Sequence, residues 1–225
     1  MIVQHNKKNI KEFLNMNKDK VLYRPLKKDD IPTLMNIVKK TWNYDKFADP
    51  KTAIKLSKVF LYSCLTNQNY TKVAEIDGNV AGIIMVKNNN QPKSRISYRI
   101  KQICSIISIY ATSSGRKSMM PFNSVHSIDK ELLDMCNIKY QGEIAFFALD
   151  EKYRGYGIGK SLFNQAKEYL QNEHVENFYL FTDTSCNYGF YDANGLTRRC
   201  SKDHFFTINN QDANMSFFIY DYSFK

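Results

Sequence analysis

Six residues in the second half of the chain, Arg154 to Gly159 (RGYGIG), have the composition of an anion-binding loop. An apolar run precedes them and a run with helical spacing follows, so the loop is expected to join a strand to a helix. The first N–H groups of a helix have no partner within it, and the helix dipole favours negative charge there. Glycines let such a backbone approach a phosphate closely. The loop therefore predicts a site for a ligand that carries phosphate.

The spacing of the glycines excludes two other phosphate-binding loops. The nucleoside-triphosphatase loop, G-x-x-x-x-G-K-[ST], would need glycine where the chain has Arg154, although residues 159–161 (GKS) fit its end. The dinucleotide loop needs G-x-G-x-x-G, whereas Gly155, Gly157 and Gly159 are evenly spaced. The pattern that does fit is [QR]-x-x-G-x-[GA], with Arg154, Gly157 and Gly159 at its defined positions.

With this pattern the chain resembles the GNAT superfamily of N-acetyltransferases. The stretch EIAFFAL (Glu143 to Leu149) is similar to the fourth strand of that family, and CNYGFYDANGL (Cys186 to Leu196) is similar to its FYxxxGF segment. The second segment ends in Leu where the family usually has Phe, which exchanges one core hydrophobe for another. We expect one domain over residues 21–225, with a leader of residues 1–20 and an insertion over residues 88–140.

The resemblance implies an α/β fold. Its central mixed sheet would have about seven strands, with an antiparallel front half and a parallel pair at a splayed centre. Helices would flank the sheet, and the insertion would be helical and precede the fourth strand.

The resemblance also implies acetyl-CoA as co-substrate, with no metal. The pantetheine arm would pair with the fourth strand like an added strand, and the amides of the glycine loop would hold the pyrophosphate. The implied cofactor-binding residues are Phe147, Ala148, Leu149, Arg154, Gly155, Tyr156, Gly157, Ile158, Gly159, Lys160 and Asn187.

Two catalytic residues are implied in the same way. Tyr191 matches the family tyrosine that protonates the leaving thiolate, and Glu143 matches a glutamate used as general base by histone-acetylating relatives. Tyr191 is also one of fifteen tyrosines and could pack in the core, while Glu143 could be a solvated strand end. The implied reaction is direct acetyl transfer to a primary amine of a small molecule or protein. The alternative is a catalytically inactive acyl-CoA sensor or interaction module of the same fold.

The elements that would position these residues follow from hydrophobic periodicity. Strands are predicted at Val21 to Leu26, Tyr70 to Ile76, Val80 to Val86, Gly142 to Leu149, Phe178 to Thr182, His204 to Ile208 and Met215 to Phe224. Helices are predicted around residues 31–42, 54–65, 96–110, 128–136, 162–170 and 187–191. Asp77-Gly78 between two β-branched runs predicts a hairpin turn.

The insertion carries a stripe of apolar residues at helical spacing. We expect this helix to end at Ser113-Ser114-Gly115. Its members are Ile96, Ile100, Ile103, Ile107 and Tyr110. Such a stripe could form a lid, a dimer face or an added core layer, and a core layer is the commonest outcome.

Composition limits the remaining classes. At 225 residues, the chain has five cysteines without a CxxC pair and four histidines without metal-ligand spacing, so we predict reduced thiols and no metal site. The net charge of +10 is spread along the chain, which makes a nucleic-acid partner unlikely. No apolar stretch approaches the roughly 20 residues of a membrane span, and no secretory signal is evident, so we predict a cytoplasmic monomer or homodimer without a membrane partner.

Overall fold

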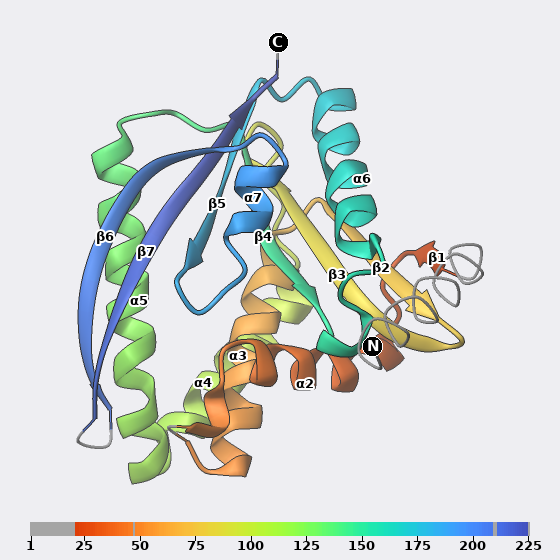
Figure 1. The fold of residues 1–225 in the computed structure, drawn as a ribbon. Coiled ribbons are helices and arrows are strands. Elements are labelled where there is room, and N and C mark those ends of the chain that lie inside the picture. Colours follow the sequence, from red (N-terminus) through yellow and green to blue (C-terminus); the bar gives the residue numbers. More distant parts are fainter. Residues whose placement is uncertain (1–20, 47, 209–210, 225) are drawn as a thin grey trace, which may run out of the picture.

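A computed structural model of the chain describes residues 21–46, 48–208 and 211–224. Its centre is a seven-stranded sheet in the order β1-β2-β3-β4-β5-β7-β6 (Figure 1). The strands are β1 (Val21–Arg24), β2 (Tyr70–Ile76), β3 (Asn79–Asn88), β4 (Gly142–Leu149), β5 (Asn177–Asp183), β6 (Thr197–Ile208) and β7 (Gln211–Ser223). Every neighbouring pair is antiparallel except β4 and β5. The predicted mixed sheet is therefore confirmed.

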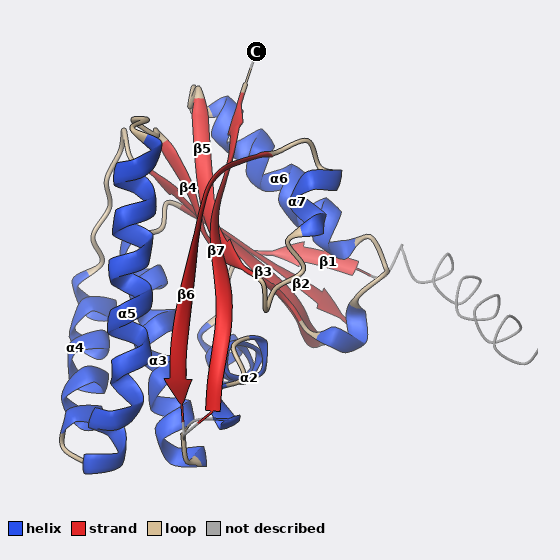
Figure 2. Cartoon of the chain, turned by 60° about the vertical axis from the view of Figure 1, so that its left-hand side comes forward, coloured by secondary structure: helices blue, strands red, loops and turns tan. Residues whose placement is uncertain are grey.

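Helices cover both faces of this sheet. They are α2 (Ile31–Thr41), α3 (Pro50–Asn67), α4 (Ile96–Tyr110), α5 (Ser113–Cys136), α6 (Ile158–Asn172) and α7 (Gly189–Ala193). Figure 2 shows α3, α4 and α5 on one side of the sheet and α6 and α7 on the other. Each side has its own apolar core, because side chains alternate between the two faces of a strand.

The antiparallel front half is organised by the hairpin of β2 and β3. Asp77 and Gly78 both have positive φ, 49° and 78°, which is the backbone that the right-handed twist of a two-residue hairpin requires. The predicted turn is confirmed. The other edge of β3 pairs with β4 from one end of β4 to the other, Gly142 to Leu149.

The central strands β4 and β5 meet over only two residues each. Gly142 is opposite Phe178 and Glu143 is opposite Tyr179, and the two strands diverge beyond this point (Figure 1). A register shift against β3 makes Ala145 an extra residue of β4 immediately afterwards. A bulge of this kind bends the strand that carries it and increases its twist. The splayed centre predicted from the sequence is therefore present.

The C-terminal part of the insertion differs from the prediction. The segment Ser113-Ser114-Gly115 does not end the helical region but forms the first turn of α5, because the Thr112 hydroxyl caps that helix by accepting a bond from the Gly115 N–H. The helix α5 is 24 residues long, whereas the sequence predicted a short helix over residues 128–136. Serine and threonine serve equally well at a helix start and in a terminating loop, so local composition could not separate the two outcomes.

The apolar stripe of α4 is not an added core layer, which corrects the sequence expectation. The helix packs on α3 through the opposite face, where Ile109 and Ser105 are buried. Five residues of the stripe are exposed to solvent by 42 to 72%, namely Ile96, Ile100, Ile103, Ile107 and Tyr110. Periodicity shows that a helix has an apolar face but not whether another element covers it.

Gly142 controls how closely β4 approaches its neighbours. A Cβ at this position would lie 2.9 Å from Leu170 and 3.1 Å from both Phe178 and Val175. We expect Gly142→Ala to lower the free energy of unfolding by about 1–3 kcal/mol through overpacking. Gly189→Ala is the matched control, since nothing but Asn187, at 4.0 Å, lies near its added methyl. Chemical denaturation of both variants tests this, and equal stabilities would contradict the predicted constraint.

Candidate functional site

The glycine loop lies where the sequence predicted it, between β4 and α6. The short 3-10 helix η4 (Glu151–Tyr153) follows β4, and α6 begins at Ile158 with Gly157 as its N-cap. Gly155 and Gly157 have φ values of 86° and 75°, a region that L side chains rarely adopt. The first loop-to-helix bond runs from the Ser161 N–H to the Gly157 carbonyl, so the N–H groups of residues 155–160 have no helical acceptor.

The divergence of β4 from β5 leaves one edge of β4 without a strand partner from Ile144 to Leu149. Strand β5 continues instead along β7, as far as Asp183 opposite Phe217. An unpaired strand edge presents N–H and C=O groups that an extended ligand can use. The predicted residues Phe147, Ala148 and Leu149 lie on this edge, and the glycine loop follows them in the chain.

Tyr191 stands on α7, on the same side of the sheet as α6. Its ring contacts Phe163 of α6, Phe190 of α7 and Tyr220 of β7, with centroid distances of 6.2, 5.5 and 5.5 Å. Phe190 also meets Phe147 of β4 at 5.4 Å, so this cluster connects β4 with β7, the antiparallel partner of β5. Burial, followed by the nearby Cys186 and Asp183, raises the pKa of the Tyr191 phenol. The phenol therefore keeps its proton at neutral pH.

Glu143 lies on the opposite face of the sheet, toward α3 and α5. Its carboxylate accepts a bond from Tyr179 Oη at 3.1 Å and forms an ion pair with Lys87 Nζ at 2.7 Å. The side chain is only 15% exposed, so it is not the solvated strand end that the sequence left open. Glu143 is thus held in a fixed orientation beside the point where β4 leaves β5.

Asp129 is a candidate site residue that the sequence pattern did not predict. It is half-buried on α5, and its pKa is raised to about 7 by burial and by the carboxylates of Glu143 and Asp183. Asp183, buried at the end of β5, is also one of the groups that raise the pKa of Tyr191. The sequence gives only a weak indication of its role, namely that Asp129 is the first acidic residue after Asp77. Only the packing of α5 against the sheet brings it to Glu143.

The polar residues of the predicted donor site are exposed. Arg154 pairs with Glu151 at 3.7 Å, and both side chains are more than half exposed. Lys160 lies in the first turn of α6, and Asn187 precedes α7, whose first residue is Gly189 rather than the predicted Asn187. The Asn187 carbonyl accepts a bond from the Phe190 N–H. These side chains are free to contact a ligand placed between the loop and α7.

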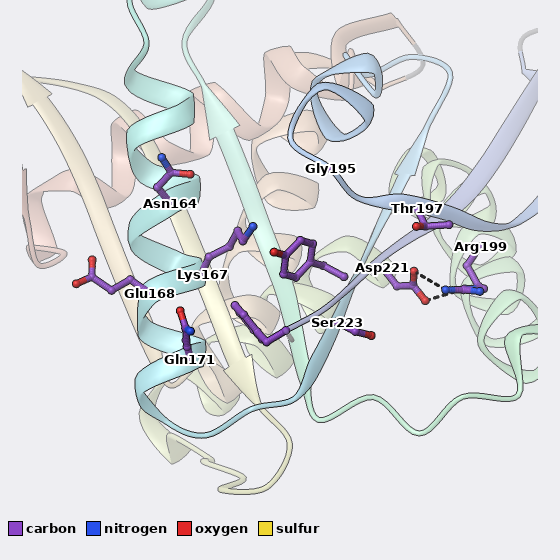
Figure 3. A pocket seen from close by; sticks show the side chains of 11 residues that line it. Asn164, Lys167, Glu168, Gln171, Gly195, Thr197, Arg199, Asp221 and Ser223 are labelled. Atoms are coloured by element: carbon purple, nitrogen blue, oxygen red, sulfur yellow. Dashed lines mark hydrogen bonds and ion pairs between the residues drawn. The ribbon is translucent and has the colours of Figure 1, made fainter.

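A hollow among the described residues lies elsewhere. It has a volume of about 720 Å³ between α6 and the ends of β6 and β7 (Figure 3). None of the predicted donor-site residues lines it. Its cations are already engaged, because Arg199 pairs with Asp221 at 2.8 Å and Lys167 lies 3.6 Å from the centre of the Tyr222 ring. The hollow therefore does not replace the divergence of β4 and β5 as the candidate site.

Comparison with known proteins decides the family resemblance. Residues 125–195, which include β4, the glycine loop, α6 and α7, match the family model described as "Acetyltransferase (GNAT) family". The resemblance to the GNAT family is confirmed. None of the curated protein sequences compared with the chain matches it significantly.

Solved structures share the fold over nearly the whole chain. A putative phosphinothricin N-acetyltransferase is 14% identical, with a TM-score of 0.54, and the match covers 91% of this chain and 99% of that one. A GNAT acetyltransferase from Elizabethkingia anophelis, solved with acetyl-CoA bound, is 12% identical with a TM-score of 0.50 and covers 92% and 99%. A chain of the NatC complex bound to Gag peptide and CoA is 18% identical, also with a TM-score of 0.50 and coverage of 92% and 99%.

The part of the chain that the structure describes contains neither a candidate metal site nor a helix that could span a membrane. No group of three His, Cys, Asp or Glu side chains there lies close enough together to hold a metal ion. Among the same residues, no helix combines the length and the apolar character needed to cross a membrane.

The raised pKa of Asp129 predicts a pH-dependent stability. Because the carboxyl titrates near 7 in the folded protein and near 4 when unfolded, the unfolded chain binds fewer protons between these values, and stability falls as pH rises through this window. Asp129→Asn removes this loss. We expect the Tm of the variant, relative to the wild type, to increase from about pH 4 to about pH 7 and then level off.

Thermal unfolding across this pH range tests the prediction. Asp134→Asn, at an exposed position on the same helix, is the control, and its Tm difference from the wild type should change little with pH. If the Tm difference between Asp129→Asn and the wild type did not change with pH, the pKa of Asp129 would not be raised in the folded protein.

Proposed function

We propose that the protein is an acetyl-CoA-dependent N-acetyltransferase that transfers the acetyl group directly to a primary amine of a small molecule or protein. One observation carries the proposal: β4 leaves β5 after Glu143, and the unpaired edge of β4 leads directly to a glycine loop with free amides. A linear ligand with an anionic centre fits this combination of an open strand edge and a helix N-terminus.

The residues present fit coenzyme A. The free N–H groups of residues 155–160 suit the pyrophosphate, and the exposed Arg154 and Lys160 supply positive charge beside it. The backbone of Phe147 to Leu149 suits the amide-containing pantetheine arm. Asn187, which precedes α7, offers an exposed side-chain amide to the same arm. Gly155 and Gly157 have nothing within 4 Å of an added Cβ, so the loop surface is open where a ligand would approach.

The chemistry divides between the two faces of the sheet. Acetyl-CoA, when bound, supplies the activated acetyl group. Tyr191 is the proposed general acid, since its phenol is protonated at neutral pH and its hydroxyl can donate to a departing thiolate. Its orientation is supported by the rings of Phe163, Phe190 and Tyr220.

Two carboxylates on the other face can accept the proton that the amine must lose. Glu143 is the base implied by the family resemblance, although its Oε2 already accepts bonds from both Lys87 and Tyr179. Asp129 has a pKa near 7, where a general base is most effective at physiological pH. We propose that Asp129 accepts the proton and that Glu143 positions the amine.

The acceptor is a proposal at the level of chemical class. The solved structures of this fold include one bound to a peptide and one described as a putative phosphinothricin acetyltransferase, so both peptide and small-molecule amines are compatible with it. The proposed compartment is the cytoplasm, a reducing environment that suits five free cysteines.

Gly157→Ala tests the donor site, with Gly78→Ala as its matched control. Both glycines have φ near 75°, and neither has any atom within 4 Å of an added Cβ. Each variant should therefore lose about 1–2 kcal/mol of stability from backbone strain. Only Gly157→Ala should weaken CoA binding, by about tenfold or more, because its methyl stands where the backbone must approach the pyrophosphate. Isothermal titration of CoA measures this, and equal affinities in the two variants would exclude the loop as the binding site.

Tyr191→Phe tests catalysis. Its acetyl transfer, scored as release of CoA thiol across a panel of amines, should fall by a factor of about 10² while CoA affinity stays nearly unchanged, because only the proton donor is lost. Tyr188→Phe, which removes a hydroxyl from the residue preceding α7, should retain activity. Saturable CoA binding without turnover of any amine would instead support the inactive binding module.

A further inference from the structure

The face of α4 turned away from the protein is apolar over its whole length. Ile96, Ile100, Ile103 and Ile107 recur at three- and four-residue intervals and are 72, 55, 48 and 63% exposed, and Tyr110 continues the line. The opposite face packs on α3 through Tyr98, Ile106 and Ile109. The exposed side chains therefore form one stripe along a helix that is already anchored, rather than scattered surface hydrophobes. We call these five residues the α4 stripe.

The charge around the α4 stripe has a single sign. From Gly78 to Ile128 the sequence contains no Asp or Glu. The basic residues of this span are Lys87, Lys93, Arg95, Arg99, Lys101, Arg116 and Lys117. The adjoining helix α3 adds Lys51, Lys55 and Lys58, also without an acidic residue. A carboxylate near the junction of α4 and α5 is Asp49, which caps α3 and accepts a bond from Ser114.

We propose that the α4 stripe docks the protein onto the surface of an anionic lipid bilayer. Isoleucines on one helix face can enter the boundary between headgroups and acyl chains, while flanking lysines and arginines meet anionic headgroups. Exposed basic residues stand at both ends of the stripe, with Lys93 and Arg99 near its start and Arg116 and Lys117 after its end. The α4 stripe and its flanking cations therefore match the apolar interior and the anionic headgroups of such a bilayer.

Two other occupants fit less well. A second copy of the chain would gain only five apolar side chains from each α4, whereas a stable interface uses about 20–30 residues on each side. A nucleic acid would meet the positive charge but leave the isoleucines without a partner. The prediction of no membrane partner rested on the lack of an apolar stretch long enough to span a bilayer. Docking at the bilayer surface needs no such stretch.

The position of α4 makes docking compatible with the proposed enzyme. Helix α4 is on the outside of the helical layer, on the side of the sheet opposite α6 and α7 (Figure 2). The glycine loop at the start of α6 would therefore stay open to the aqueous phase. The protein would act at a membrane surface without inserting its donor site.

Flotation of the full chain with lipid vesicles tests the proposal. The wild type should bind vesicles of phosphatidylcholine that contain phosphatidylserine and should be released at high salt. The double variant Ile103→Glu/Ile107→Glu should lose at least about tenfold in partitioning, because it places two charges in the apolar stripe. The variant Lys93→Gln/Arg99→Gln should lose more than about tenfold, at roughly fivefold for each cation removed.

Phe205→Glu is the matched control, since Phe205 is 73% exposed on β6, away from α4, and its variant should bind vesicles like the wild type. Circular dichroism and CoA affinity should be unchanged in all variants, because every altered side chain is exposed. Absence of binding to phosphatidylserine vesicles, or an equal loss in Phe205→Glu, would overturn the proposal. Two other results would also overturn it. One is a concentration-dependent dimer that the Ile103→Glu/Ile107→Glu variant no longer forms. The other is binding of an oligonucleotide to the same surface that is unchanged in this variant.

Discussion

The short parallel contact between β4 and β5 is the constraint on which the rest of the site depends. These two strands join the antiparallel halves of the sheet, yet they are paired only at Gly142 and Glu143. Gly142 permits the contact because Leu170, Val175 and Phe178 leave no room for a side chain. The bulge at Ala145 then turns β4 away. A fully paired centre would be more regular, but it would offer no free strand edge to a ligand.

Separate cores keep the two strands apart beyond this contact. One side of the sheet is filled by α6 and the aromatic cluster around Phe163 and Phe190, and the other side is filled by α3 and α5. Strand β5 is held independently by its ladder with β7. Because each strand has its own partners, the divergence is a stable feature of the packing rather than a gap awaiting closure. It also separates the proposed acid, Tyr191, from the carboxylates Glu143 and Asp129.

The insertion is part of this arrangement and not an appendage. Helix α5 contributes Ile128 and Leu132 to the core beneath β6 and β7, and the same packing brings Asp129 near Glu143. Burial and like charge raise the pKa of Asp129 because no cation was found paired with it among the described residues. Helix α4, in contrast, is anchored by one face and leaves the other to solvent. A single inserted segment thus supplies both a candidate catalytic carboxylate and a surface suited to lipid.

The features that rest on local chemistry follow from the order of the amino acids alone. The glycines of RGYGIG, the Asp77-Gly78 turn and the apolar run of β4 each admit one backbone solution, so the loop, the hairpin and the family resemblance could all be predicted. The roles of the inserted helices depend instead on packing between distant segments. Serines at residues 113–114 suit a helix start as well as its end, and an isoleucine stripe has the same period whether it is buried or exposed. The pairing of Glu143 with Lys87 and the raised pKa of Asp129 likewise arise from contacts between distant segments, which no local pattern specifies.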